Sequence, residues 1–546
     1  MKYSNTYIRC LVVALTLVVS CNTDELHELN INPQTVDEID VNFLFTAAEL
    51  GAASAGSAGD NRYIDWRTNI GMTAYAIQQL ACGDCPGGIS PGDKYEHNAE
   101  TAAAPFEFIY GDQLKNIAEI LKQTGPGGYD EGNKVNMRNA ARILRAFLFH
   151  RLTDYYGNIP YFEANTATDI VNGAKFPKYD KQSVIYADLL KEIDEATAAM
   201  GAPDPLDGFE AADIIYDGNV DQWKKWGYSL MLRMAMRISN VAPDVANTYV
   251  AKAIAGGVFE SNDDNAVVPM AITPSLWTNQ NGISRAFIPG DGGQPSYLSK
   301  TLIDFLKGND KNSTADDDPR LMIISGGIGI WTATDWEPQN VDPLQQKGPP
   351  NGLDAAQLDA YEGKPVSSTS ELATEYSRIN VKMMDRDEPY MLMNFGEVKL
   401  LLAEAAERNI GGLTPGDAQA NYEEGVKASM QMYTLYDPTL TVADAAVTTY
   451  LATYPYTGTT AQKLEKIGGQ LWVNHFLNWW EAWSDYRRTG FPVLVPINFP
   501  GNETGGTIPA RLRYPTSEVG GNPNFNAGAT LPDLYTTKVW WAGGAD

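Results

Sequence analysis

Three segments of the sequence place tryptophan beside planar polar side chains. Residues 62–69 read RYIDWRTN, residues 275–285 read SLWTNQNGISR, and residues 329–336 read GIWTATDW. Aromatic rings stack on the CH faces of sugars, while amide, carboxylate and guanidinium groups bond to sugar hydroxyls. These segments therefore predict a ligand site, although each tryptophan could equally pack inside its own loop. The candidate binding residues are Tyr63, Asp65, Trp66, Arg67, Asn69, Trp277, Asn279, Asn281, Arg285, Trp331 and Trp336.

Catalytic motifs are weak in this sequence. GISPG (88–92) matches the pattern of a serine nucleophile, but Pro91 follows Ser90 and has no N–H for an oxyanion hole. The sequence contains no zinc-protease, phosphate-loop or dinucleotide motif, and it has only 4 histidines. A glycosidase with paired carboxylates stays open as an alternative, because 68 acidic residues make some close pairs inevitable. We expect no enzymatic activity and no cofactor.

Metal binding is also not expected. The acidic runs at 262–265 and 316–318 lack the ordered ligand spacing of a calcium loop and are typical of solvated surface. Cys82 and Cys85 lie in CGDC, where they form either a tight disulfide or two free thiols. A zinc site would need further ligands nearby, and the nearest histidine in sequence is His97.

The amino terminus has the pattern of a secretory signal. Lys2 and Arg9 precede an apolar run at 11–19, which is shorter than the roughly 20 residues of a membrane span. The order Val-Val-Ser-Cys resembles the lipobox of bacterial lipoproteins. This resemblance implies a signal peptide at 1–20, acylation of Cys21, and a lipidated tether at 21–40. An ordinary signal peptide with an incidental cysteine is the alternative.

Two further features concern location and partners. Asp24 and Glu25 resemble the short acidic tag that sends lipoproteins of the Bacteroidota to the cell surface. The formal net charge of -27 argues against binding to nucleic acid or to an anionic membrane surface, because both require a basic face. With 546 residues, the chain is long enough for one to three domains.

Apolar residues at spacings of three and four predict amphipathic helices. Gly157 is expected to end the first of them and Asp180 to cap the second. Because the helices follow one another in pairs, they suggest stacked helical hairpins, although no period of about 34 residues repeats. The predicted helices span 134–157, 179–200, 221–239, 394–409, 417–433 and 464–488.

The last predicted helix is rich in tryptophan and arginine. Trp472, Phe476, Trp479 and Trp483 lie on one stripe, which is typical of a core face. Arg487 and Arg488 are expected to cap carbonyls at the end of this helix or to pair with nearby acids. Trp540 and Trp541 are likewise expected to anchor the chain end by packing.

Residues 56–100 and 260–390 have a different character. They are rich in Gly, Pro, Asn and Asp, with tryptophans at no helical period. Loops of this length are uncommon unless they are functional or disordered, and their aromatic content argues against disorder. The sequence thus predicts a mainly α fold, in which a helical scaffold supports an irregular, loop-rich ligand-binding subdomain.

Seven segments, in the same order along nearly the whole mature chain, resemble the signatures of the SusD/RagB family of nutrient-binding outer-membrane lipoproteins. The seven segments are ARILRAFLFHRLTDYYGNIPYFEA (141–164), YDKQSVIYADLLKEID (179–194), DIIYDGNVDQWKKWGYSLMLRMAMRIS (213–239), DPRL (318–321), LLLAEAAERN (400–409), WWEAWSDYRRTGFP (479–492) and IPARLRYPTSEVGGNPNF (508–525). The expected lipidated terminus and a carboxy-terminal VWW extend the resemblance.

The resemblance implies a scaffold of tetratricopeptide-like helical hairpins and a single domain at 41–546. The scaffold is expected at about 101–259 and 391–490, and the binding subdomain at about 56–100, 260–390 and 491–546. It also implies an oligosaccharide ligand, or a peptide as in RagB-like members, which passes to a SusC-like TonB-dependent transporter. The expected location is the outer membrane, lipid-anchored and facing the exterior.

Overall fold

The computed structural model describes most of the chain. The described residues are 39–53, 63–83, 90–164, 174–202, 207–273, 279–287, 296–331, 336–525 and 530–546, with the backbone alone at 330–331, 336–337 and 369–370. The chain divides into two units, residues 1–41 and 42–546, and the elements below lie in the second, except that α3 begins at Val41. The expected signal peptide, Cys21 and Trp277 lie outside the described residues.

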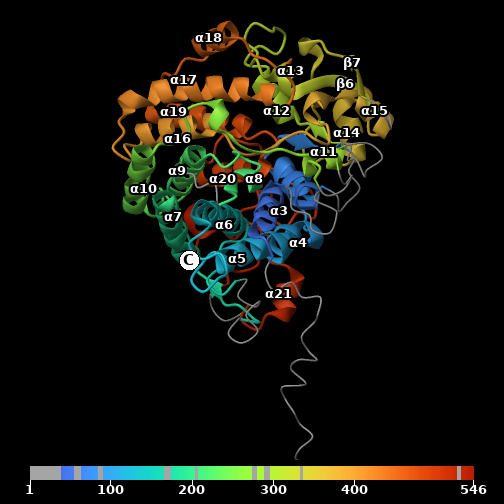
Figure 1. The fold of residues 1–546 in the computed structure, drawn as a ribbon. Helices are drawn as coiled ribbons and strands as arrows, with labels where there is room; N and C mark the ends of the chain where they lie inside the picture. The colour runs from blue at the N-terminus through green and yellow to red at the C-terminus, as the bar shows by residue number, and fades with distance from the viewer. Residues whose placement is uncertain are drawn as a thin grey trace, which may run out of the picture. The chain divides into compact units, whose positions relative to one another are not determined.

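Helices dominate the second unit (Figure 1). The longer ones are α3 (Val41–Ala53), α4 (Ala99–Phe108), α5 (Leu114–Gln123), α6 (Val135–Tyr156), α7 (Gln182–Ala199), α9 (Val220–Arg237), α10 (Pro243–Gly256), α16 (Phe395–Glu407), α17 (Pro415–Gln431), α18 (Asp444–Thr453), α19 (Thr460–Asn474) and α20 (Trp479–Thr489). Short α-helices are α8 (Phe209–Ala212), α11 (Gly282–Phe287), α12 (Lys300–Leu306), α13 (Leu321–Ile324), α14 (Ala355–Glu362), α15 (Thr369–Glu375) and α21 (Thr516–Gly521).

Two π-helices and six 3₁₀ turns complete the helical elements of the described residues. The π-helices are η1 (Ile64–Ala74) and η3 (Ile109–Gln113). The 3₁₀ turns are η2 (Pro91–Asp93), η4 (Asn262–Asp264), η5 (Pro343–Gln345), η6 (Val381–Met383), η7 (Met432–Leu435) and η8 (Trp540–Ala542). None of the helices in the described ranges combines the length and the apolar character that a membrane crossing requires.

Consecutive helices pack as hairpins, which confirms the predicted tetratricopeptide-like helical fold. The pairs are α6 with α7, α9 with α10, α16 with α17, and α19 with α20. Figure 1 shows α16 and α17 lying side by side. Successive hairpins also meet, because α7 packs on α9 and α16 packs on α19. The result is a continuous core that runs from one hairpin to the next.

The helix predicted at 134–157 is α6, and its end shows why a glycine is needed there. Leu144, Leu148 and Leu152 are fully buried on its core face. Gly157 follows with φ +83°, and a Cβ at this position would lie 2.5 Å from Leu531 Cδ1. Both the left-handed backbone and the close contact exclude a larger side chain.

The prediction that Asp180 caps the next helix is wrong. Lys181 occupies the cap position of α7, and Asp180 ends strand β3 instead. The carboxylate of Asp180 accepts hydrogen bonds from the backbone N–H groups of Tyr161 and Phe162, each at 3.0 Å. An aspartate just before a helix can either cap that helix or bond a distant part of the backbone. The sequence pattern is the same in both cases, so it could not distinguish the two roles.

The single helix predicted at 464–488 is also wrong, because the chain breaks between α19 and α20. Leu477 lies in the break with φ +75°, which helical residues do not adopt. Trp472, Trp479 and Trp483 are nonetheless buried as predicted, on two helices rather than one stripe. The indole N–H of Trp472 donates to the Ile77 carbonyl at 3.0 Å, so the break brings α19 against a segment far away in sequence.

Short antiparallel strands tie the loop-rich segments together. The pairs are β1 (Leu80–Ala81) with β5 (Tyr297–Leu298), β2 (Ile159–Pro160) with β3 (Tyr179–Asp180), and β4 (Ala266–Val268) with β9 (Tyr390–Met393). One sheet has three strands, in the order β7 (Trp336–Asn340), β6 (Ser325–Trp331) and β8 (Ser377–Ile379).

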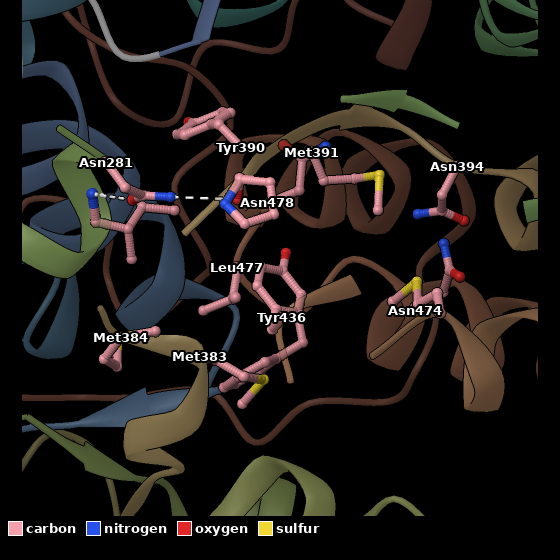
Figure 2. A pocket seen from close by; sticks show the side chains of 14 residues that line it. Asn281, Met383, Met384, Tyr390, Met391, Asn394, Tyr436, Asn474, Leu477 and Asn478 are labelled. Atoms are coloured by element: carbon pink, nitrogen blue, oxygen red, sulfur yellow. Dashed lines mark hydrogen bonds between the residues drawn. The ribbon is translucent and has the colours of Figure 1, made fainter. Parts of the chain in front are cut away.

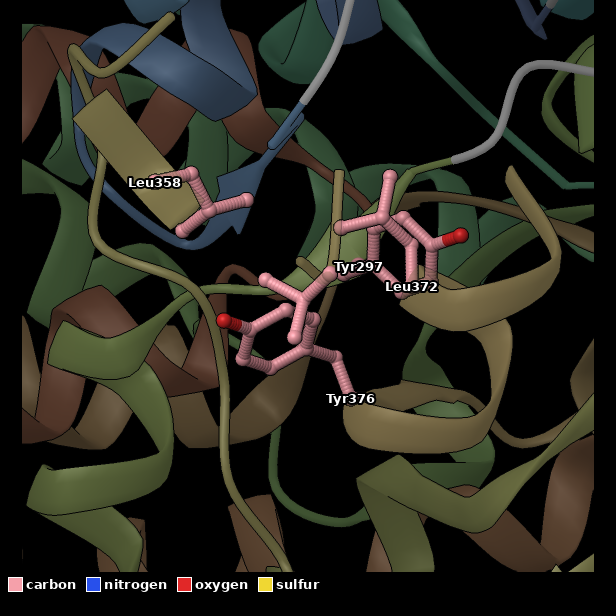
Figure 3. Close-up of a cluster of buried hydrophobic side chains, with 5 residues drawn as sticks. Tyr297, Leu358, Leu372 and Tyr376 are labelled. Carbon is pink, nitrogen blue, oxygen red and sulfur yellow. The ribbon is translucent and has the colours of Figure 1, made fainter. Parts of the chain in front are cut away.

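Part of the loop-rich sequence has a hydrophobic core of its own (Figure 3). Tyr297 and Tyr376 pack with their ring centroids 6.0 Å apart, and aliphatic side chains surround them. The fully buried members of this core are Tyr297, Leu358, Val366, Leu372 and Tyr376. A sequence without helical periodicity is therefore still folded, which agrees with its aromatic content.

Candidate ligand-binding site

The first predicted segment forms a cluster of aromatic rings at the start of η1. Tyr63 and Trp66 are both half-buried, with ring centroids 6.2 Å apart and planes at 19°. Phe108, the last residue of α4, is half-buried too and lies 5.8 Å from Tyr63 at 17°. Near-parallel rings at these separations are offset from one another, and each of the three residues keeps part of its surface exposed. Tyr63, Trp66 and Phe108 are the aromatic cluster.

A cation lies against this cluster. The guanidinium carbon of Arg67 is 4.4 Å from the centre of the Tyr63 ring, and Arg67 Nη2 is 3.0 Å from Glu100 Oε2. Glu100 keeps 71% of its side chain exposed, whereas Arg67 keeps 27%. Arg67 is thus held by a ring and a carboxylate while part of it faces solvent. Rings with an adjacent guanidinium and carboxylate offer a saccharide both stacking and hydroxyl partners.

Asp65 and Asn69 face the interior instead. Both are fully buried. Asp65 Oδ1 accepts hydrogen bonds from Asn69 Nδ2 at 3.0 Å and from the hydroxyl of Tyr390 at 2.8 Å. Burial, together with the charge of Asp65, raises the pKa of Tyr390 well above its ordinary value, so this hydroxyl stays protonated and can donate. Predicted as ligand contacts, Asp65 and Asn69 instead have structural roles in the folded chain.

Asn69 connects η1 to the break between α19 and α20. Its Nδ2 donates to the Leu477 carbonyl at 3.2 Å, and its Oδ1 accepts from the Trp480 backbone N–H at 3.1 Å. One carboxamide thereby satisfies a carbonyl in the break and a backbone donor at the start of α20, groups that a helix end leaves without helical partners. The helix η1, which carries Trp66 of the aromatic cluster, is consequently attached to the scaffold through Asn69.

The second predicted segment packs beside the first, because α11 contacts η1. Asn281 caps α11: its Oδ1 accepts from the backbone N–H groups of Ile283 at 2.9 Å and Ser284 at 3.1 Å. Its Nδ2 donates to the Pro389 carbonyl at 3.3 Å. Asn281 is therefore buried and engaged in positioning α11, and Arg285 is fully buried on the same short helix.

Asn279 is the member of this segment with partial exposure. Its backbone carbonyl accepts a hydrogen bond from the Ala271 N–H at 2.7 Å. Trp277 lies just outside the described residues. Trp331 and Trp336 are opposite one another across the β6–β7 pair, at the end nearest residues 332–335. The binding roles of all four residues stay predictions.

A small cavity beneath these elements is not the ligand site. It encloses about 20 Å³ and is lined by Asn281, Asn474, several methionines and Tyr390 (Figure 2). Within the described part of the chain, neither amide atom of Asn474 has a hydrogen-bond partner. A space of this size, with the Asn474 amide in a largely apolar wall, fits one water molecule and no sugar.

Sequence reasoning missed Phe108 and Glu100, because both fall in a helical segment whose face toward η1 is not readable from periodicity. It left the state of Cys82 open, and the structure has this cysteine in a disulfide. Cys85, the proposed partner, lies outside the described residues.

A second polar region lies inside the scaffold and has different chemistry. Arg237 contacts Glu481, Asp485 at 3.0 Å and Asp154 at 3.1 Å, and all four side chains are buried. Arg233 forms two bonds to Glu397, at 2.5 and 2.6 Å. These are charge-assisted pairs in the protein interior. The buried ionic network is defined here as Asp154, Arg233, Arg237, Glu397, Glu404, His475, Glu481, Asp485 and Arg488.

Two groups of side chains of metal-ligand type lie in this network or, for His150, directly beside it. They are His150, Asp154 and Glu481, and Glu397, His475 and Glu481. Both share Glu481, which is paired with Arg237. Arginine thus supplies the positive charge that a metal ion would bring. The burial of Asp485 favours its neutral form, but Arg488 and Arg237 outweigh this and hold its pKa well below the ordinary value.

Of the two roles predicted for the arginines at the end of α20, pairing with nearby acids is confirmed for Arg488. Arg488 pairs with Glu404, at 2.7 Å for the Nη2–Oε2 contact, and with Asp485 at 3.1 Å. Arg487 instead donates to two carbonyls outside α20, those of Asp154 on α6 at 2.7 Å and of Ala510 at 3.0 Å, so it ties other segments to α20 rather than capping the end of this helix.

The fold and these two regions define a helical-hairpin protein with a surface aromatic cluster, and comparison with known proteins gives its class. A family model described as "Starch-binding associating with outer membrane" (SusD-like) matches residues 33–515. No curated protein matches the chain. The chain belongs to the SusD-like family.

Solved structures agree with this assignment. A chitin-binding protein is 30% identical, with a TM-score of 0.74 over 92% of this chain and 100% of its own. A Bacteroidetes SusD-like protein is 25% identical, with a TM-score of 0.75 and coverage of 92% and 100%. A chitin-binding SusD homologue from Flavobacterium johnsoniae is 22% identical, with a TM-score of 0.70 and coverage of 92% and 99%, and shows the shared fold.

Proposed function

We propose that this protein captures oligosaccharides at the aromatic cluster and passes them to a SusC-like TonB-dependent transporter. The observation that carries the proposal is the set of three near-parallel, half-buried rings with Arg67 alongside. The family description as starch-binding and the chitin-binding relative support a saccharide ligand. The protein acts by binding and catalyses no reaction.

The proposed location follows from the family and from the amino terminus. The family is associated with the outer membrane. Acylation of Cys21 would anchor the chain there, and the acidic residues after it favour the outer face of the cell. Delivery requires release, so the site holds its ligand with modest affinity while another surface stays on the transporter. Loop closure over the ligand would couple capture to transfer.

The test is calorimetric titration of residues 22–546 with chitohexaose, maltohexaose and a tryptic peptide digest. We expect binding of at least one hexasaccharide, and a loss of about tenfold or more in affinity for Trp66→Ala, equivalent to about 1.4 kcal/mol. Tyr249→Ala is the matched control, because Tyr249 is a half-buried aromatic residue on α10, outside the cluster.

Each other outcome selects a different reading. Binding of the peptide digest alone would identify a peptide-import protein of RagB type. Release of reducing ends from either saccharide would identify a hydrolase. Saccharide binding that Trp66→Ala leaves unchanged would place the site elsewhere on the molecule.

A further inference from the structure

A groove of about 660 Å³ lies on the helical scaffold, built from α12, α17, α18 and α19. Figure 1 shows these four helices in the upper part of the view. Helix α4, which carries Phe108 of the aromatic cluster, lies lower in the same view. The groove and the cluster have no residue in common. Its aromatic lining residues are Phe305, Tyr422, Tyr450 and Tyr454.

The floor of the groove is fixed by a buried chain of hydrogen bonds. Arg320 donates to Asp318 Oδ2 and to Gln470 Oε1, each at 2.6 Å. Gln470 Nε2 in turn donates to the Tyr450 hydroxyl at 2.8 Å. All four side chains are buried. Since each group in this chain is held by the next, the Tyr450 ring is set in place before any ligand arrives, which lowers the entropic cost of binding.

One wall is fixed in a similar way. The Tyr454 hydroxyl lies 3.0 Å from Asp316 Oδ2, and its ring centroid lies 5.0 Å from that of Tyr450 at 46°. Asp316 also accepts from the Asn309 N–H at 2.8 Å, which closes the loop after α12. Gly308 in this loop has φ +62°, and a Cβ there would lie 2.4 Å from the Tyr454 hydroxyl. The loop backbone thus approaches Tyr454 as closely as glycine allows.

Further lining residues on α12 and α19 add ring surface and polar groups. Phe305 is half-buried, with its ring 5.5 Å from Trp472 at 69°. Gly469 lies behind this ring, because a Cβ at Gly469 would come within 3.2 Å of it. Gln462 and Glu465 project from exposed positions on α19. The groove therefore combines two half-buried rings, two buried tyrosines and exposed carboxamide and carboxylate groups.

We propose that this groove is a second saccharide site, which binds a short oligosaccharide between Phe305 and Tyr454 with Gln462 and Glu465 as hydroxyl partners. The volume lies within the range of about 300–1,000 Å³ typical of small-molecule sites. Rings with carboxylates and amides nearby suit neutral sugars. The lining carboxylates of Asp304, Asp316 and Glu465 outnumber its one cationic side chain, Lys466, which disfavours anionic ligands.

The saccharide class of the ligand rests on the proposed function. The location of the second site in the groove does not depend on it. The two sites would allow one glycan chain, or two, to be held on one molecule. Two weak contacts on one chain raise the overall affinity without tightening either site, so a long glycan is retained while each contact still releases.

The experiment is titration of residues 22–546 with chitohexaose and maltohexaose, in which the number of sites is measured. Wild type should bind two molecules of the preferred hexasaccharide per chain. Trp66→Ala should weaken one of the two sites about tenfold or more and leave the groove as the remaining site with its wild-type affinity. Tyr454→Ala and Glu465→Ala should each weaken that remaining site about tenfold in the Trp66→Ala background.

Two control variants separate binding from folding. Tyr454→Phe loses the bond to Asp316 but keeps the ring that contacts the ligand. Because the ring is kept, the affinity of the groove should stay within about threefold of wild type. Glu465 is exposed, and its removal leaves the core intact. Tyr249→Ala should change neither site, and thermal unfolding of every variant is compared with wild type.

The failures are distinguishable. A single site that Trp66→Ala weakens about tenfold or more, and that Tyr454→Ala and Glu465→Ala leave unchanged, overturns the second site and leaves the proposed function standing. A single site that responds to the groove variants and not to Trp66→Ala overturns the proposed location and keeps the groove. Failure of wild type to bind either hexasaccharide overturns both.

Discussion

The buried ionic network and the aromatic cluster use their side chains in opposite ways. In the network, Arg237 contacts three carboxylates, and every one of these groups is buried. In the cluster, Tyr63 and Trp66 are half-buried, while Asp65 and Asn69 on the same helix are fully buried. The network directs charge toward internal partners, whereas the cluster leaves ring surface toward solvent.

This difference teaches where binding residues are to be sought in such a fold. A buried charge must be paired inside the protein, because an unpaired one costs several kcal/mol. A buried polar residue next to a surface ring likewise needs partners inside the protein. Asn69 has such partners in Leu477 and Trp480, so it is not available to a ligand. The side chains that remain for ligand are those on the outer side of η1.

The largest effect should come from breaking the network. Arg237→Ala leaves Asp154, Glu481 and Asp485 with buried charge, and we expect a loss of about 3–5 kcal/mol in the free energy of unfolding, measured in urea. Lys252→Ala is the control: its pair with Asp194 is 45% and 34% exposed, and it should cost at most about 1 kcal/mol. Equal urea midpoints for the two variants would show that the network is not a stabilising element.

A smaller effect should come from the link between the two regions. Asn69→Ala removes bonds to Leu477, Trp480 and Asp65, and we expect a loss of about 1–3 kcal/mol in stability. Saccharide affinity should fall as well, because η1 loses its attachment below the aromatic cluster. Asn421→Ala, whose Nδ2 bonds the Asp417 carbonyl on the surface of α17, is the matched control. Lower stability with unchanged affinity would mean that the cluster is positioned independently of α20.

The smallest effect concerns pH and sharpens the contrast between carboxylates. Burial raises the pKa of Asp93 to about 6, although Gly352 N–H and the Asn351 amide partly oppose this. In the scaffold, arginines lower the pKa of Asp485 instead. Asp93 binds its proton more tightly when folded, so its contribution to stability is full below about pH 4 and is lost as the pH rises through about 6.

Asp93→Asn mimics the neutral carboxyl group and removes this dependence. The unfolding temperature of wild type should fall relative to that of Asp93→Asn by on the order of 2 °C between pH 4 and 7, followed by differential scanning calorimetry. A constant difference across this range would show that Asp93 does not titrate there.

The hairpin scaffold could be predicted from sequence because its signal is periodic. Leu144, Leu148 and Leu152 repeat at helical spacing and are buried on one face of α6. The break at Leu477 could not be predicted, since the residues on both sides keep helical spacing. The residues of the break are held by a contact far away in sequence: Asn69 donates to the Leu477 carbonyl across 408 residues.

The candidate site was predictable in type and only partly in its members. Tyr63, Trp66 and Arg67 form the exposed side of η1, as the residue types suggested. Asp65 and Asn69 have the same chemistry as ligand contacts, but they point inward because η1 packs on α20. The orientation of a polar residue on a non-periodic segment depends on which neighbour covers it, and single-sequence patterns do not carry that information.

The attachment of η1 to the last scaffold helices has a consequence for when the protein can finish folding. Asn69 bonds to Trp480, 411 residues later, and Trp472 bonds back to Ile77 across 395 residues. Contacts of such sequence separation form late and slowly. The segment that carries Tyr63 and Trp66 therefore reaches its final conformation only after nearly the whole chain has been synthesised.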